Sequence, residues 1–150
     1  MLHFAVPLVL LLGALPGTYA GNLIAQNNCN FPIWCGAAKN DGTFSPSVQV
    51  PAGGQYLSPK PAYNDNVGAV AKCGMTPGLL EPYQLELAVK DGRSWLDLSS
   101  ITAAPFKPFH RHAEIAGTEC VLDCQPWQGE CEYPTSVDCQ SMGDAIMTLC

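Results

Sequence analysis

The clearest hydrophobic pattern lies in residues 82–99, which read PYQLELAVKDGRSWLDLS. Apolar and polar residues alternate on both sides of Asp91-Gly92, a dipeptide that favours a type I′ turn. A two-residue turn fixes the register of a hairpin, so Glu86 is expected to face Asp97 on the polar side. The segment therefore predicts an antiparallel hairpin whose other, apolar face is directed to a core.

The rest of the chain adds shorter β signals and no long helical pattern. Residues 48–50 (VQV) predict a strand that enters a Pro-Gly-Gly turn, and the apolar run 145–149 predicts a buried strand. Residues 55–80 are expected to be mostly loop, and residues 120–139 to form an irregular loop cross-linked by cysteines. Trp34 follows a β-prone run and is expected in the core. The pattern predicts an all-β protein.

Composition narrows the function classes. Charged residues make up 13% of the 150 residues and hydrophobic residues 47%, which excludes a disordered chain. Seven lysines and arginines stand against 13 aspartates and glutamates, so no basic patch is expected for nucleic acid or for an anionic membrane surface. The 14 glycines and 13 prolines are typical of a turn-rich β protein.

The first 20 residues are interpreted as a secretory signal peptide. An apolar run, FAVPLVLLL, is followed by Thr18 and Ala20, small residues at positions −3 and −1 of a cut before Gly21. The run is shorter than the ~18 residues of a membrane span. Residues 1–20 are therefore expected to be removed, and residues 21–150 to form one domain.

All eight cysteines lie after the predicted cut, at positions 29, 35, 73, 120, 124, 131, 139 and 150. An even number of cysteines in a secreted chain predicts disulfides, here about four. A zinc site formed by Cys120, Cys124 and Cys131 is the alternative. Spacing alone leaves the connectivity open.

Four segments resemble the small fungal proteins known as antigenic thaumatin-like, or yeast-phase-specific, proteins. These segments are NNCNFPIWCGA at 27–37, VPAGGQY at 50–56, residues 83–106 with WLDLSSI, and the C-terminal strand that ends in Leu149-Cys150. The resemblance implies a thaumatin-like β-sandwich, secretion, and a carbohydrate-related or host-interaction role. The chain has no room for the second disulfide-rich domain of the larger plant relatives.

The resemblance also bears on the disulfides, because thaumatin-like proteins tie their first cysteine to their last. Cys150 is the last residue, and its chain end would fray unless something fixed it. The strand before it needs a partner, for which the N-terminal strand is the natural candidate. We therefore expect Cys29–Cys150, with Cys35–Cys73 next by elimination and the remaining four cysteines paired among themselves. Pairing of Cys150 within the 120–139 cluster is the alternative.

The predicted hairpin carries the first candidate site, formed by Glu86, Trp95 and Asp97. Two carboxylates that share a site can act as acid and base, and the indole ring could stack on a sugar. A solvated sheet face without any function is the alternative reading, because a flat face supplies no cleft around a glycosidic bond.

Two further groups of residues are candidates. His110, His112 and Glu114 would share one face of a strand and could ligate a metal ion, or they form an exposed polar strand edge or loop. Trp127 and Tyr133 lie in the cysteine-rich loop, where they could bind a sugar or a protein, or pack structurally within the loop.

Together these patterns favour a secreted, disulfide-rich protein that binds rather than catalyses, antigen- or effector-like, outside the cell or associated with a cell wall. The expected partner is β-glucan or another cell-wall polysaccharide, or a host protein; neither nucleic acid nor a membrane is expected. We expect a monomer that uses no cofactor and no metal. A weak β-glucan hydrolase that uses Glu86 and Asp97, and a structural cell-surface antigen, are the alternatives.

Overall fold

The computed structural model describes residues 19–150, which form β-strands and connecting turns. The strands are β1 (Tyr19–Gly21), β2 (Leu23–Asn27), β3 (Ile33–Lys39), β4 (Val48–Val50), β5 (Gln55–Leu57), β6 (Ala62–Tyr63), β7 (Ala69–Gly74), β8 (Tyr83–Lys90), β9 (Arg93–Ser100), β10 (Arg111–Ile115), β11 (Val121–Cys124), β12 (Ser136–Cys139) and β13 (Ala145–Leu149). The all-β prediction is confirmed for these residues.

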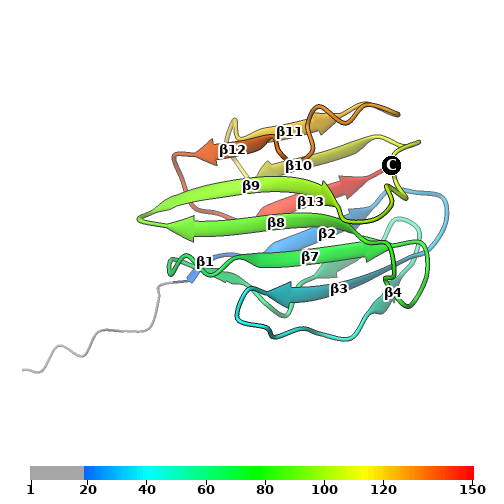
Figure 1. Cartoon of the computed structure of the whole chain (residues 1–150), viewed down its shortest axis with the longest axis horizontal. Helices are drawn as coiled ribbons and strands as arrows, with labels where there is room; N and C mark the ends of the chain where they lie inside the picture. The colour runs from blue at the N-terminus through cyan, green and yellow to red at the C-terminus, as the bar shows by residue number, and fades with distance from the viewer. Residues whose placement is uncertain (1–18) are drawn as a thin grey trace, which may run out of the picture.

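Two sheets pack face to face as a sandwich (Figure 1). The larger sheet has six strands in the order β12-β9-β8-β7-β3-β4, and the smaller has five in the order β11-β10-β13-β2-β5. A separate two-stranded ladder joins β1 to β6. In each sheet the alternation of buried and more exposed residues leaves one face against the core and the other toward solvent.

The predicted hairpin is confirmed as β8 and β9, in the predicted register. Asp91 and Gly92 form its turn with φ angles of 51° and 77°, the left-handed values that a type I′ turn requires at both positions. The core side of the hairpin consists of fully buried leucine and valine side chains: Leu85, Leu87, Val89, Leu96 and Leu98. Glu86 faces Asp97 on the opposite, outer face.

Three local predictions are wrong. Residues 55–80, expected to be mostly loop, contain β5, β6 and β7, and β7 is an inner strand of the six-stranded sheet. The expected loop at 120–139 contains β11 and β12 at its ends. Trp34 lies on the outer face of β3 and is only partly buried, because Ile33 and Cys35 on either side of it take the core positions. The strands predicted at 48–50 and 145–149 are confirmed.

The first and last cysteines are paired as expected. β13 runs parallel to β2 in the middle of the five-stranded sheet, with Leu149 opposite Asn27. The Cys29–Cys150 disulfide lies just past this pair and spans a Cα–Cα distance of 4.8 Å. It therefore closes the whole domain into one loop.

The other three disulfides also agree with the expectation. Cys35 and Cys73 lie directly opposite each other on β3 and β7. Cys120–Cys139 and Cys124–Cys131 pair the remaining four cysteines among themselves. Since β11 and β12 are edge strands of different sheets, Cys120–Cys139 ties the two layers together along one side. No cysteine is left to form the alternative zinc site.

The described part of the chain contains no helix that could cross a membrane. Most of the predicted signal peptide lies outside the described residues, whereas Tyr19 and Ala20 form the start of β1. A cut before Gly21 stays a prediction.

Candidate functional site

The outer face of the β8–β9 hairpin brings together the predicted carboxylates. Glu86 accepts hydrogen bonds from the Ser99 hydroxyl at 2.5 Å and from the Gln84 amide at 3.4 Å. Asp97 faces Glu86 across the strand pair. Its Oδ1 atom is buried and has no hydrogen-bond partner within residues 19–150. The two carboxylates therefore differ, since one is held by hydrogen bonds and the other is only partly satisfied.

This environment raises the pKa of the Asp97 carboxyl. Burial is the main cause, and the nearby Glu86 carboxylate adds to it, while the Ser136 side chain acts in the opposite direction. A carboxyl whose pKa is higher in the folded protein than in the unfolded chain binds its proton more tightly when folded. Ionised Asp97 is thus a source of instability at neutral pH.

Replacing Asp97 with asparagine is expected to stabilise the protein at pH 7 by about 0.2–1 kcal/mol, the size of the repulsion between like charges opposite each other on a sheet. In the wild type, protonation of Asp97 stabilises the folded protein. This contribution is fully present below pH 3.8, the ordinary pKa of an aspartate, and is lost as the pH rises through the higher pKa of the folded state. Urea unfolding from pH 3.5 to 7 should show the advantage of Asp97→Asn growing with pH. A variant less stable than wild type at pH 7 would contradict this.

Trp95 lies beside these carboxylates, toward the turn of the hairpin. On the outer face it stands between Ala88 of β8 and Asp138 of β12. The small Ala88 side chain leaves the indole ring partly exposed next to a hollow of about 570 Å³. The residues that line this hollow are Asn66, Ala88, Lys90, Asp91, Arg93 and Trp95. We refer to it as the Trp95 hollow.

Backbone bonds and an ion pair fix the rim of the Trp95 hollow. Asn66 donates its backbone N–H to the Val89 carbonyl at 2.9 Å, which holds the preceding loop against the hairpin. Arg93 is paired with the Asp138 carboxylate of β12. Lys90 and Asp91, both exposed, contribute one charge of each sign. The hollow therefore combines an aromatic ring, hydrogen-bonding groups and balanced charge.

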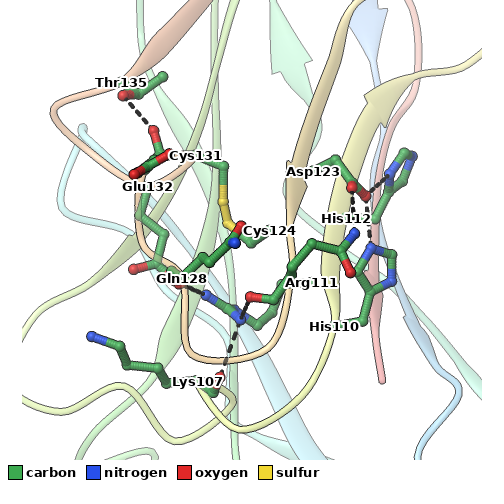
Figure 2. Close-up of a disulfide and its surroundings, with 12 residues drawn as sticks. Lys107, His110, Arg111, His112, Asp123, Cys124, Gln128, Cys131, Glu132 and Thr135 are labelled. Atoms are coloured by element: carbon green, nitrogen blue, oxygen red, sulfur yellow. Dashed lines mark hydrogen bonds and ion pairs between the residues drawn. A yellow bond between two sulfur atoms is a disulfide. The ribbon is translucent and has the colours of Figure 1, made fainter.

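The histidine motif is arranged differently from the prediction. His110 and His112 both bond to one carboxylate oxygen of Asp123 on β11, at 2.7 and 3.2 Å (Figure 2). Glu114 lies 3.5 Å from His112. Slight burial raises the pKa of Asp123, but hydrogen bonds with the two histidines and Gln125 outweigh it and lower that pKa. Among residues 19–150, no group of three or more His, Cys, Asp or Glu side chains could hold a metal ion. Because β10 lies between β11 and β13, the motif is a hydrogen-bonded polar group on the outer face of the sheet, and the expected strand edge is wrong.

Arg111, between the two histidines, has a structural role that the sequence did not suggest. Its side chain is fully buried and donates to the carbonyl oxygens of Lys107, Phe109, Gln125 and Gln128 and to the Glu132 carboxylate (Figure 2). The Glu132 carboxylate also accepts a hydrogen bond from the hydroxyl of buried Tyr83, at 2.9 Å. Burial raises the pKa of this tyrosine, and the Glu132 charge adds to the shift. The Arg111 guanidinium thus supplies hydrogen-bond donors to carbonyl groups of the 125–135 loop that have no backbone partner in a sheet.

Trp127 and Tyr133 are displayed by that loop. Their exposed fractions are 69% and 72%, so the alternative in which they pack within the loop is wrong. The Cys124–Cys131 disulfide closes the loop at its base (Figure 2). These two residues do not line the Trp95 hollow. The structure therefore separates the candidate ligand-binding residues into two places.

Comparisons with known proteins agree with this fold. The structure resembles that of the protein elicitor MoHrip2 from Magnaporthe oryzae, with a TM-score of 0.75 and 19% identity, over 87% of this chain and 99% of that one. It also resembles the thaumatin-like xylanase inhibitor TLXI, with a TM-score of 0.61 and 13% identity, over 85% of this chain and 98% of that one. A sequence comparison with curated proteins gave no match.

A family model settles the membership that the sequence segments suggested. The model of the Bys1 family, described as Blastomyces yeast-phase-specific protein, matches residues 11–150. The match covers all of the sandwich, including the eight paired cysteines, Trp95, Trp127 and Tyr133. The chain therefore belongs to the Bys1 yeast-phase-specific family and has a thaumatin-like β-sandwich fold.

Proposed function

We propose that this protein acts outside the cell as a non-catalytic binding protein for a neutral cell-wall polysaccharide, and that the Trp95 hollow is its binding site. Four disulfides support an extracellular location, because such bonds persist in oxidising compartments. The likeness to a protein described as an elicitor is consistent with action outside the fungal cell.

The observation that carries the proposal is the composition of the Trp95 hollow. A pyranose ring has an apolar C–H face, which stacks on an indole, and a rim of hydroxyl groups, which need donors and acceptors. Trp95 supplies the indole ring for stacking. Asn66, Lys90 and Asp91 supply donors and acceptors for the hydroxyl groups. Because Lys90 is offset by Asp91 and Arg93 by Asp138, the hollow favours a neutral sugar over a uronic acid.

The carboxylate pair favours binding over hydrolysis. Neither Glu86 nor Asp97 lines the Trp95 hollow, so a sugar stacked on the ring is not enclosed between the two carboxylates. Glu86 is also held by Ser99 and Gln84. Glycoside hydrolysis needs both carboxyl groups to flank the scissile bond, and an open strand pair does not provide that arrangement.

Trp95→Ala is expected to weaken retention on the polysaccharide about tenfold, which corresponds to about 1.4 kcal/mol, from the lost stacking and buried area. Co-sedimentation of the secreted protein with insoluble β-glucan, chitin and cellulose measures this. Because Trp95 is partly exposed on the outer face, the variant should keep the melting temperature of the wild type within a few degrees.

Two controls sharpen this experiment. Phe44→Ala removes another aromatic ring, 80% exposed, that does not line the hollow, and it should bind like the wild type. Trp95→Phe keeps a ring and should restore most of the binding. Soluble sugar released from the pellet would favour the hydrolase alternative. Equal retention of wild type and Trp95→Ala, or no retention of the wild type on any of the three polysaccharides, would overturn the proposal.

A further inference from the structure

The 125–135 loop is irregular in its backbone but is anchored at several points by hydrogen bonds and a disulfide. Its carbonyl groups at Gln125 and Gln128 accept from the buried Arg111 guanidinium at 3.1 and 2.5 Å. The backbone N–H of Trp127 donates to the Lys107 carbonyl, and the backbone N–H of Tyr133 donates to the Leu98 carbonyl of β9. The Cys124–Cys131 disulfide adds a covalent closure. The loop is therefore tied to β9, to β10 and to the segment before β10.

This anchored loop presents its two largest apolar side chains to solvent. Trp127 is 69% exposed and Tyr133 72% exposed. Trp127 also has a φ of 67°, a left-handed conformation that is unusual for a bulky residue and that the hydrogen bond to Lys107 helps to hold. Holding such rings in place before binding lowers the entropy that a ligand must overcome.

The surroundings of the two rings favour a sugar over a protein surface. Gln125, Gln128 and Glu130 are exposed on the same loop, and no aromatic contact joins Trp127 to Tyr133 in the described chain. A protein interface would need a contiguous apolar patch. Separate rings set among amide and carboxylate groups instead match the alternating C–H and hydroxyl surfaces of a polysaccharide.

The loop and the Trp95 hollow meet β9 at different points along the strand. The hollow adjoins the Asp91-Gly92 turn, whereas Tyr133 is bonded to Leu98 near the other end of β9. Leu98 lies three residues beyond Trp95, which is roughly 10 Å along an extended strand, so the two places are separate points of contact on the same side of the protein.

We propose that the 125–135 loop is a second binding surface for a neutral polysaccharide, with Trp127 and Tyr133 as its stacking groups, so that one protein molecule bridges two polysaccharide chains. This inference rests on the proposed function, because the Trp95 hollow is taken as the first site. A two-site protein also gains avidity on a dense wall surface, where binding at one site raises the effective concentration at the other.

A bridging experiment tests this inference. Insoluble β-glucan is loaded with the protein, washed, and then offered a fluorescently labelled soluble β-glucan. The loaded wild type should capture the label. The double variant Trp127→Ala/Tyr133→Ala should stay on the pellet through the Trp95 hollow but capture at least tenfold less label, and Trp127→Phe/Tyr133→Phe should restore capture. Sedimentation in free solution verifies that each protein is a monomer, so that a dimer with a single site per chain is recognised.

The outcomes separate the two proposals. Capture of label by Trp127→Ala/Tyr133→Ala at the wild-type level, or bridging that requires a dimer, would overturn the second surface and leave the Trp95 hollow intact. To test the Trp95 hollow alone, Trp95→Ala is added to the loop double variant, and retention of this triple variant at the level of the double variant would overturn the proposed function instead. Melting temperatures unchanged by the loop substitutions would show that lost capture is not caused by unfolding.

Discussion

Replacing Arg111 with methionine is expected to destabilise the protein by about 3–5 kcal/mol, the cost of breaking a buried ion pair by removing one partner. The Glu132 carboxylate would lose its buried cation, and the carbonyl groups of the 125–135 loop would lose their donors. Methionine has a similar length but donates no hydrogen bond, so the loss comes mainly from the polar interactions and less from packing. Urea unfolding followed by fluorescence measures the change.

Arg93→Met is the matched control. Arg93 also pairs with a carboxylate, Asp138, but both side chains are more than 40% exposed, and exposed ion pairs contribute about 0–1 kcal/mol. The Arg93 variant should therefore unfold near the wild-type midpoint while the Arg111 variant unfolds much earlier. If both variants lost the same small amount, Arg111 would not be the group that supports the loop.

Removing the Cys29–Cys150 disulfide is the second large expected effect. The bond closes a loop with a sequence separation of 121, which in the chain-entropy model corresponds to about 4–5 kcal/mol. Replacing both cysteines with alanine should lower the free energy of unfolding by that amount. The parallel β2–β13 pair, which joins the two ends of the chain, would then be held only by its hydrogen bonds and packing.

Removal of Cys124–Cys131 provides the comparison, since this bond closes a loop with a sequence separation of only 7 and is worth about 2 kcal/mol in the same model. Guanidinium unfolding of the two alanine double variants under non-reducing conditions should give the Cys29/Cys150 variant a clearly lower free energy of unfolding than the Cys124/Cys131 variant. The reverse order would mean that loop entropy does not decide the stability of this sandwich.

Features determined by local pattern could be predicted from the sequence. The β8–β9 hairpin was accessible because its alternation is regular and Asp91-Gly92 fixes the register. β7 was missed because its sequence, AVAKCG, has small side chains and lies in a segment rich in glycine and proline. Its strand state depends on pairing with β3 and β8, which the segment itself does not encode.

In the candidate site, too, some residues follow from the local pattern and others are brought in only by the fold. Trp95, Glu86 and Asp97 follow from the hairpin register, but Asn66 reaches the Trp95 hollow only through the fold. Arg111 could have been found, because strand alternation places it on the core face with Ala113 and Ile115. An arginine at a core position of a strand predicts a buried network of carbonyl and carboxylate partners.

The assignment of Asp123 as the partner of the histidines shows why long-range contacts escape sequence analysis. His112 faces Asp123 because β10 and β11 are neighbours in the five-stranded sheet. In the sequence, Glu114 lies closer to both histidines and was the natural choice. Only the pairing of two strands decides which carboxylate reaches the imidazole rings.

The most direct test of the polysaccharide-binding account uses the three tryptophans as separate probes. Their indole N–H groups give three resolvable signals in a nitrogen–proton NMR spectrum, which can be followed while a soluble oligosaccharide of the bound polysaccharide is added. The Trp95 signal should move saturably, the Trp127 signal should also move, and the Trp34 signal, from a ring that does not line the hollow, should stay in place. A Trp95 signal that does not respond while the oligosaccharide binds would contradict the central claim.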